Sequence, residues 1–176
     1  DATVVLLYYD LAGIAPPFDA WVEEDTRVRF AAAADKAAQR QTVRAELESA
    51  AASVKSIGML RLTMHGNLSE YDPSYGEFTV RALAPSSTVE FKALQQKVSL
   101  RFANGATAQT WQVPPDQAQA IRDRIGYGSA SIDVALRIAG VQPSPGGGTI
   151  VTEVLRYELR EDRGGTTLGR VQVAGP

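Results

Sequence analysis

Residues 131–138 read Ser-Ile-Asp-Val-Ala-Leu-Arg-Ile, and residues 150–159 read Ile-Val-Thr-Glu-Val-Leu-Arg-Tyr-Glu-Leu. Apolar residues alternate with polar or small ones along the first stretch and recur along the second. A period of two residues is typical of strands that bury one face and expose the other. The two stretches therefore predict strands over residues 130–140 and 149–161, joined by a mobile Pro/Gly-rich loop over residues 142–148.

Shorter stretches with the same period lie on both sides of this pair. One segment, residues 115–125, has helical spacing instead, and Pro115 suits the first turn of a helix. About eight strands with hairpin-length connections predict the α+β class, as an antiparallel β-sandwich or a strongly curved sheet with one inserted short helix. The additional strands are expected near residues 57–65, 78–82, 89–91, 98–102 and 166–173.

The dipeptide Asn104-Gly105 has the typical sequence of a two-residue β-turn, in which both residues take positive φ angles. A hairpin at this point places Val98 opposite Trp111. Aromatic and β-branched residues in such cross-strand pairs stabilise a sheet. The sequence therefore predicts that the chain reverses direction at residues 104 and 105.

The N-terminal third is predicted to be helical. Residues 2–11 form an apolar segment before Gly13, which indicates a short buried helix, with a strand as the alternative. Pro17 begins a second helix that includes Val22, and a third helix runs from residue 25 or 26 to about residue 52, on the order of 40 Å. We expect residues 1–54 to be a helical region packing on the sheet and residues 55–176 to be the antiparallel β region with the helix at 115–125. Together they are expected to form a single domain.

Composition excludes several classes of protein. The 176 residues contain no cysteine, so disulfides, thiolate nucleophiles and cysteine-based zinc sites are ruled out. A net charge of −2 argues against a nucleic-acid partner, because proteins that bind nucleic acids usually attract the phosphate backbone with a net positive charge. The longest apolar run, residues 4–9, is far shorter than a membrane-spanning segment. We expect no nucleic-acid partner and no transmembrane segment.

The sequence contains no recognisable catalytic set. His65 is the one histidine, and the alternation places it on the exposed face of its strand. No Gly-x-Ser-x-Gly motif occurs, and the usual transition-metal sites need more histidines or cysteines. We therefore predict no cofactor, no metal and no catalytic residue.

The richest polar segment is a loop between two expected strands, and with His65 it supplies the candidate binding residues. Three carboxylates within eight residues can bind Ca²⁺ or act as an acid/base pair. The sequence Asp72-Pro73-Ser74 followed by Gly76 is also sufficient for a structural turn, anchored by Tyr71. Both interpretations stay open at this point for the loop residues Glu70, Tyr71, Asp72, Tyr75 and Glu77.

Three segments resemble an exported bacterial domain family of unknown function. They are Leu7-Tyr8-Tyr9, Pro17-Phe18-Asp19-Ala20-Trp21, and Leu68-Ser69-Glu70-Tyr71-Asp72 leading to Gly76-Glu77-Phe78. The resemblance covers the first half of the chain, and Pro73-Ser74 departs from it. It implies a bacterial and periplasmic setting and transfers no catalytic residue. The Asp1-Ala2 start is compatible with removal of a signal peptide; a cytoplasmic location is the alternative.

The expected function is a non-enzymatic binding or protein-interaction domain, with a protein partner or self-association. It rests on the absence of a catalytic set and on the many turn-rich loops of a β-scaffold. One alternative is a hydrolase or carbohydrate-active enzyme that uses Glu70, Asp72 and Glu77 near His65. Another is a carrier of a small ligand or lipid, which needs an apolar cavity between sheet and helices.

Overall fold

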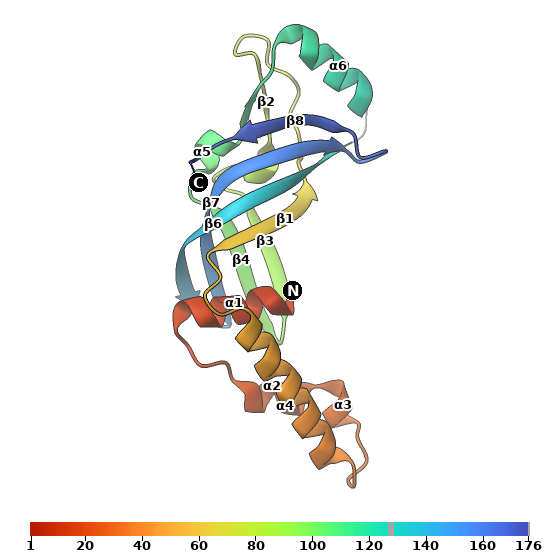
Figure 1. Ribbon diagram of the computed structural model, residues 1–176, viewed down its shortest axis with the longest axis vertical. Helices are drawn as coiled ribbons and strands as arrows, with labels where there is room; N and C mark the ends of the chain where they lie inside the picture. The colour runs from red at the N-terminus through yellow and green to blue at the C-terminus, as the bar shows by residue number, and fades with distance from the viewer. Residues whose placement is uncertain (127–128, 176) are drawn as a thin grey trace. The chain divides into compact units, whose positions relative to one another are not determined.

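The structure is a computed structural model that describes residues 1–126 and 129–175, and it confirms the α+β class (Figure 1). Its helices are α1 (Ala2–Ala12), α2 (Phe18–Glu24), α3 (Thr26–Arg29), α4 (Lys36–Ser53), α5 (Gly105–Ala108) and α6 (Pro115–Ile125), with a 3₁₀ turn η1 (Arg81–Leu83). The strands among the described residues are β1 (Met59–His65), β2 (Glu77–Thr79), β3 (Thr88–Ala93), β4 (Gln96–Phe102), β5 (Thr110–Gln112), β6 (Ala130–Ser144), β7 (Gly147–Glu161) and β8 (Thr167–Gln172).

The strands form a main sheet of six and a small sheet of two. The main sheet has the order β1-β6-β7-β4-β3, with β8 also paired to β7, and the small sheet pairs β2 with β5. Strand β1 is antiparallel to β6, and β8 is antiparallel to β7. Strand β4 is parallel to β7, because Lys97 N–H donates to Gly146 O and Ala103 N–H donates to Thr152 O. The main sheet is therefore mixed. Parallel strands need a long connection, and here the chain between β4 and β7 provides it.

By its contacts the chain divides into two compact units. Unit 1 consists of residues 1–57, 90–99 and 141–149, and unit 2 consists of residues 58–89, 100–140 and 150–176. Unit 1 therefore contains α1 to α4 and short parts of four strands. Within it, Asp1, the residue before α1, accepts a hydrogen bond from Lys92 N–H of β3 at 3.3 Å.

The core of unit 2 explains the alternation that decides the fold. Ile132, Val134 and Leu136 of β6 are all buried, together with Tyr157 of β7. The Tyr157 hydroxyl donates to Ala108 O at 2.8 Å, and burial raises the pKa of this phenol. The same cluster includes Phe78, Val80, Leu83, Phe102, Trp111, Val113, Ala118, Ile121, Val154 and Leu159.

The hairpin predicted at Asn104-Gly105 is wrong. The chain continues from β4 into α5, and Trp111 pairs with Phe78, whose ring stacks on it at 5.2 Å. Asn104 has φ −100°, and its side chain bonds to the N–H and C=O of Val154 at 2.8 and 2.9 Å. The Asn104 side chain therefore continues the hydrogen bonding between β4 and β7 beyond the end of β4. Gly105 is required by close packing, since a Cβ there would lie 2.4 Å from Leu83 O.

The true two-residue turn joins β3 and β4. Both of its residues, Leu94 and Gln95, have positive φ angles, 53° and 60°. This is the backbone of the turn type that Asn-Gly normally provides. The sequence signal for that turn is absent because neither residue favours the left-handed region.

Helices α1 and α2 confirm their predictions, and Gly13 ends α1 with φ 65°. The single long helix expected from residue 25 to 52 is wrong, because the chain is interrupted between α3 and α4. The interruption lets Val28 pack with Val43 and Val22. In one straight helix Val28 and Val43 would be about 22 Å apart. Burial of Val28 therefore favours two separate helices, α3 and α4, over one continuous helix.

The mobile loop expected at residues 142–148 is also wrong. Strand β6 extends to Ser144 and β7 begins at Gly147, which leaves a tight turn between them. A Cβ on Gly147 would lie 1.8 Å from Lys97 O, and one on Gly148 would lie 2.3 Å from the Tyr8 ring. Both positions need glycine, because their neighbours within unit 1 lie too close to admit a side chain.

Candidate functional site

The carboxylate-bearing loop that the sequence singled out forms a structural turn. Asp72 accepts hydrogen bonds from the N–H groups of Ser74 at 2.8 Å and Tyr75 at 3.3 Å. Its backbone pairs with Glu77 in both directions, at 2.8 and 3.2 Å. The Asp72 carboxylate therefore stabilises the turn that leads into β2, as an Asx turn does.

Tyr71 anchors this turn in the core of unit 2. The side chain is buried, and its hydroxyl donates to Val113 O at 2.7 Å. Its ring contacts Phe78 at 5.1 Å, and the Arg122 guanidinium lies 5.6 Å from the ring centre. The predicted anchoring role agrees with these contacts.

Among the described residues, no hydrogen bond or ion pair joins the side chains of the remaining candidates to one another. Tyr75 is 75% exposed and Glu70 is exposed, while Glu77 lies half-buried in β2. The His65 side chain is on the exposed face of β1, as predicted, and its Nδ1 is 3.8 Å from an Asp162 oxygen. Within residues 1–126 and 129–175, no three acidic or histidine side chains are placed to hold a metal ion.

A substitution distinguishes anchoring from binding at this loop. We expect Tyr71→Phe to lower the free energy of unfolding by about 1 kcal/mol, because it removes the hydrogen bond to a buried carbonyl. Urea denaturation measures this loss. Glu70→Gln is the control, and it should leave stability within about 0.5 kcal/mol of the wild type because Glu70 is exposed. An unchanged midpoint for Tyr71→Phe would contradict the anchoring role.

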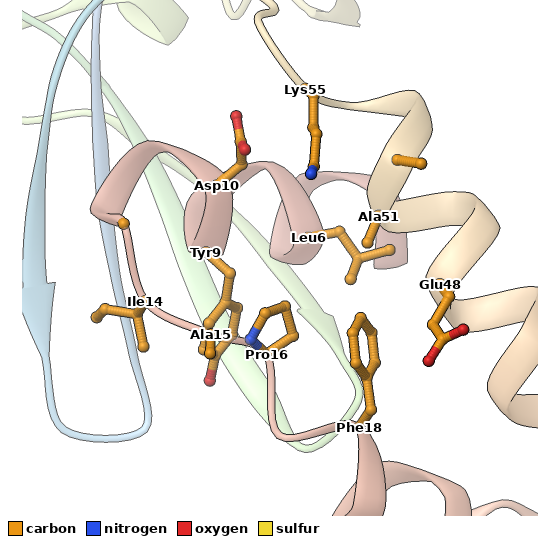
Figure 2. Close-up of a pocket in the computed structure, with 12 residues that line it drawn as sticks. Leu6, Tyr9, Asp10, Ile14, Ala15, Pro16, Phe18, Glu48, Ala51 and Lys55 are labelled. Carbon is orange, nitrogen blue, oxygen red and sulfur yellow. The ribbon is translucent and has the colours of Figure 1, made fainter.

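A pocket in unit 1 is a concave site with apolar walls. We call it the apolar pocket; its volume is about 390 Å³, and Figure 2 shows its walls coming from α1, the α1–α2 connection and α4. This volume lies within the usual range of ligand sites. The lining residues are Leu6, Tyr9, Asp10, Gly13, Ile14, Ala15, Pro16, Phe18, Glu48, Ala51, Ala52 and Lys55.

An aromatic cluster supports the Phe18 wall of the apolar pocket. Phe18 and Tyr9 both meet Trp21 edge to face, at 6.1 and 5.3 Å between ring centres, and Tyr8 meets Tyr9 at 5.4 Å. Such contacts hold the rings in defined positions. Burial, followed by the neighbouring Tyr8, raises the pKa of Tyr9.

Charged groups lie at the rim of the apolar pocket. Glu48 accepts a hydrogen bond from Arg44 at 2.8 Å, and Arg44 also pairs with Asp19 and lies 5.9 Å from the Phe18 ring centre. Lys55 and Asp10 form no ion pair with another residue in the described part of the chain. The rim can therefore offer either charge to the polar end of a ligand.

Sequence reasoning missed the apolar pocket. Tyr8, Tyr9 and Trp21, which support it, are buried. The pocket depends on α4 returning alongside α1, which the two helices show by their mutual contacts. Pro16 and Pro17, which break the chain between α1 and α2, are the one local signal near it.

Comparison with known proteins provides no relative. No protein-family model matches the chain, and searches of curated proteins and of solved structures found no match. None of the helices in the described segments has the length and apolar character needed to cross a bilayer. The function must therefore be argued from the chain's own geometry.

Proposed function

We propose that this chain is a non-enzymatic binding domain that holds an apolar side chain of a protein partner in the apolar pocket. The observation that carries the proposal is the pocket itself. It combines walls from Leu6, Pro16 and Phe18 with charged groups at the rim, the combination that is typical of binding sites.

The exposure of the pocket walls favours a protein partner over a small-ligand carrier. Carriers and cofactor sites enclose most of the ligand's surface. Here Ile14 is 44% exposed, and Gly13, Ala15 and Ala52 are exposed as well. A partner protein covers such an open site with its own surface, and a buried aromatic or aliphatic residue then supplies much of the affinity.

The hydrolase alternative has less support from the contacts of its residues. A glycosidase needs two carboxyl groups that face the same bond of the substrate. The Asp72 carboxylate instead accepts two backbone hydrogen bonds within its own turn, and His65 lies beside Asp162. The bacterial and exported setting stays an expectation of the resemblance described above.

A peptide-display selection on the full chain tests the proposal. We expect enriched peptides to share one large apolar residue, because the pocket accommodates a single apolar group. Ala51→Phe should fill the pocket from α4 and weaken the binding of the enriched peptides about tenfold or more, measured by isothermal titration calorimetry. Circular dichroism verifies that the variant is folded.

Ala50→Phe is the matched control, because Ala50 is an exposed neighbour in α4 that does not line the pocket. It should bind the peptides as the wild type does. Equal binding by Ala51→Phe, or peptides without a shared apolar residue, would refute the proposal. Analytical ultracentrifugation tests for self-association. An apparent mass that rises with concentration for the wild type but not for Ala51→Phe would identify the partner as a second copy of the chain.

A further inference from the structure

Unit 2 has a hollow on the exposed face of the main sheet, which we call the arginine groove. Its volume is about 320 Å³, and its lining comes from β1, β6, β7 and β8. Ala135 of β6 is paired directly with Arg61 of β1. Because Ala135 has only a methyl side chain, the longer residues around it leave a hollow. The charged residues that line the groove are Arg61, Asp133, Arg156, Glu158 and Arg170.

Both carboxylates of the arginine groove already have partners. Glu158 accepts hydrogen bonds from Thr167 at 2.7 Å, Arg160 at 3.0 Å and Arg170 at 3.1 Å. The bonds from Thr167 and then Arg170 lower the pKa of Glu158 to about 2. Asp133 accepts a hydrogen bond from Thr63 and lies 3.5 Å from Arg160. Glu158 therefore stays ionised at neutral pH, and the two carboxylates together orient Arg160 and Arg170.

Two arginines of the groove remain available. Arg61 and Arg156 form no ion pair or side-chain hydrogen bond with any residue in the part of the chain that the structure describes. The groove lining contains three arginines and two carboxylates, a net charge of +1. Arg160, which pairs with both carboxylates, adds a further positive charge beside it. This positive charge is local, since the whole chain has a net charge of −2.

We propose that the arginine groove binds the phosphoryl group of a small phosphomonoester. Arg61 and Arg156 come from β1 and β7, on either side of β6, so their strands are about 10 Å apart. Their side chains can approach one anion above Ala135 from opposite sides. Planar guanidinium groups bind phosphate oxygens in pairs, and a phosphoryl dianion has three oxygens to offer to two arginines.

The geometry favours this ligand over other anions. A carboxylate has two oxygens and is satisfied by one bidentate arginine, whereas two unpaired guanidinium groups are present. A nucleic-acid strand needs positive charge along an extended track, and the charge here is concentrated at one hollow. The inference is independent of the apolar pocket, because every residue involved belongs to unit 2.

The test is a titration with glycerol 3-phosphate at pH 8 and constant ionic strength, followed by NMR of the arginine Nε–H groups. We expect saturable shifts of Arg61 and Arg156. The double variant Arg61→Gln/Arg156→Gln should bind about tenfold or more weakly. Arg61→Lys/Arg156→Lys keeps both charges but lacks the planar forks, and it should also bind more weakly.

Arg124→Gln/Arg163→Gln is the control with the same change in net charge, because both residues are exposed and lie outside the groove. It should bind as the wild type does. Shifts that do not saturate, or equal losses in the control and the groove variant, would overturn the proposal. Equal affinity for succinate would overturn the phosphoryl assignment, and equal affinity of the lysine variant would show that charge alone attracts the anion. The circular dichroism spectrum of each variant verifies its fold.

Discussion

Gly147→Ala is expected to lower the free energy of unfolding of unit 1 by about 3–5 kcal/mol. A Cβ at this position would lie 1.8 Å from Lys97 O and 2.7 Å from Lys97 C, both backbone atoms that cannot rotate away. The φ of Gly147 is 153°, which L-residues rarely adopt. The substitution must therefore either separate the β7 segment from β4 or strain the turn.

Tryptophan fluorescence during urea denaturation measures this effect. The chain has two tryptophans, with Trp21 in unit 1 and Trp111 in unit 2. In a Trp111→Phe background, Trp21 reports on unit 1 alone, and Gly147→Ala is compared with that background. Thermal unfolding should show a midpoint roughly 10 °C lower.

Gly140→Ala is the matched control for the glycine prediction. Gly140 lies in β6, its φ is not positive, and a Cβ there would have no atom within 4 Å. We expect no loss of stability, because alanine restricts the unfolded chain without a clash in the folded state. A loss for Gly147→Ala as small as that for Gly140→Ala would show that the turn region is loosely packed.

Asn104→Ala is expected to lower the free energy of unfolding of unit 2 by about 2–4 kcal/mol. The Asn104 amide satisfies both the N–H and the C=O of Val154, a fully buried residue. Removing the amide leaves a buried donor and a buried acceptor without partners. Fluorescence of Trp111 in a Trp21→Phe background measures the loss.

Asn104→Asp separates the two hydrogen bonds. At pH 7 the carboxylate can still accept from Val154 N–H, but it faces Val154 O and cannot donate. The folded state should therefore raise the pKa of the introduced carboxyl above its unfolded value. The stability difference from the wild type should then shrink as the pH falls through this raised pKa, because the protonated group donates again, and it should level off below about 4, the unfolded value. A difference that does not depend on pH would contradict this geometry.

Period and composition predicted the strands and helices whose cause is local. The alternation of Ile132, Val134 and Leu136 predicted β6 because each apolar residue needs the same buried face. The helical spacing of Ala118 and Ile121 after Pro115 predicted α6 with the bounds that the structure shows. Such patterns are informative because residues two apart in a strand, or three to four apart in a helix, lie on the same face of the element.

The predictions that were wrong all depended on contacts between distant residues. The Asn104-Gly105 hairpin gives way to hydrogen bonds with Val154, fifty positions later. The long helix is interrupted between α3 and α4, which lets Val28 pack against Val43. The glycines expected to make a mobile loop instead pack against Lys97 and Tyr8. In each case the local signal is real, but tertiary packing provides a larger stabilisation.

By itself the sequence determined the α+β class, about eight strands, the position of α6 and the exposure of His65. The parallel β4–β7 pair, the apolar pocket and the arginine groove were decided by the tertiary structure alone. Each of these joins residues from at least two separate elements. A period along one element reports which face is buried, but it contains no information about which other element covers or adjoins that face.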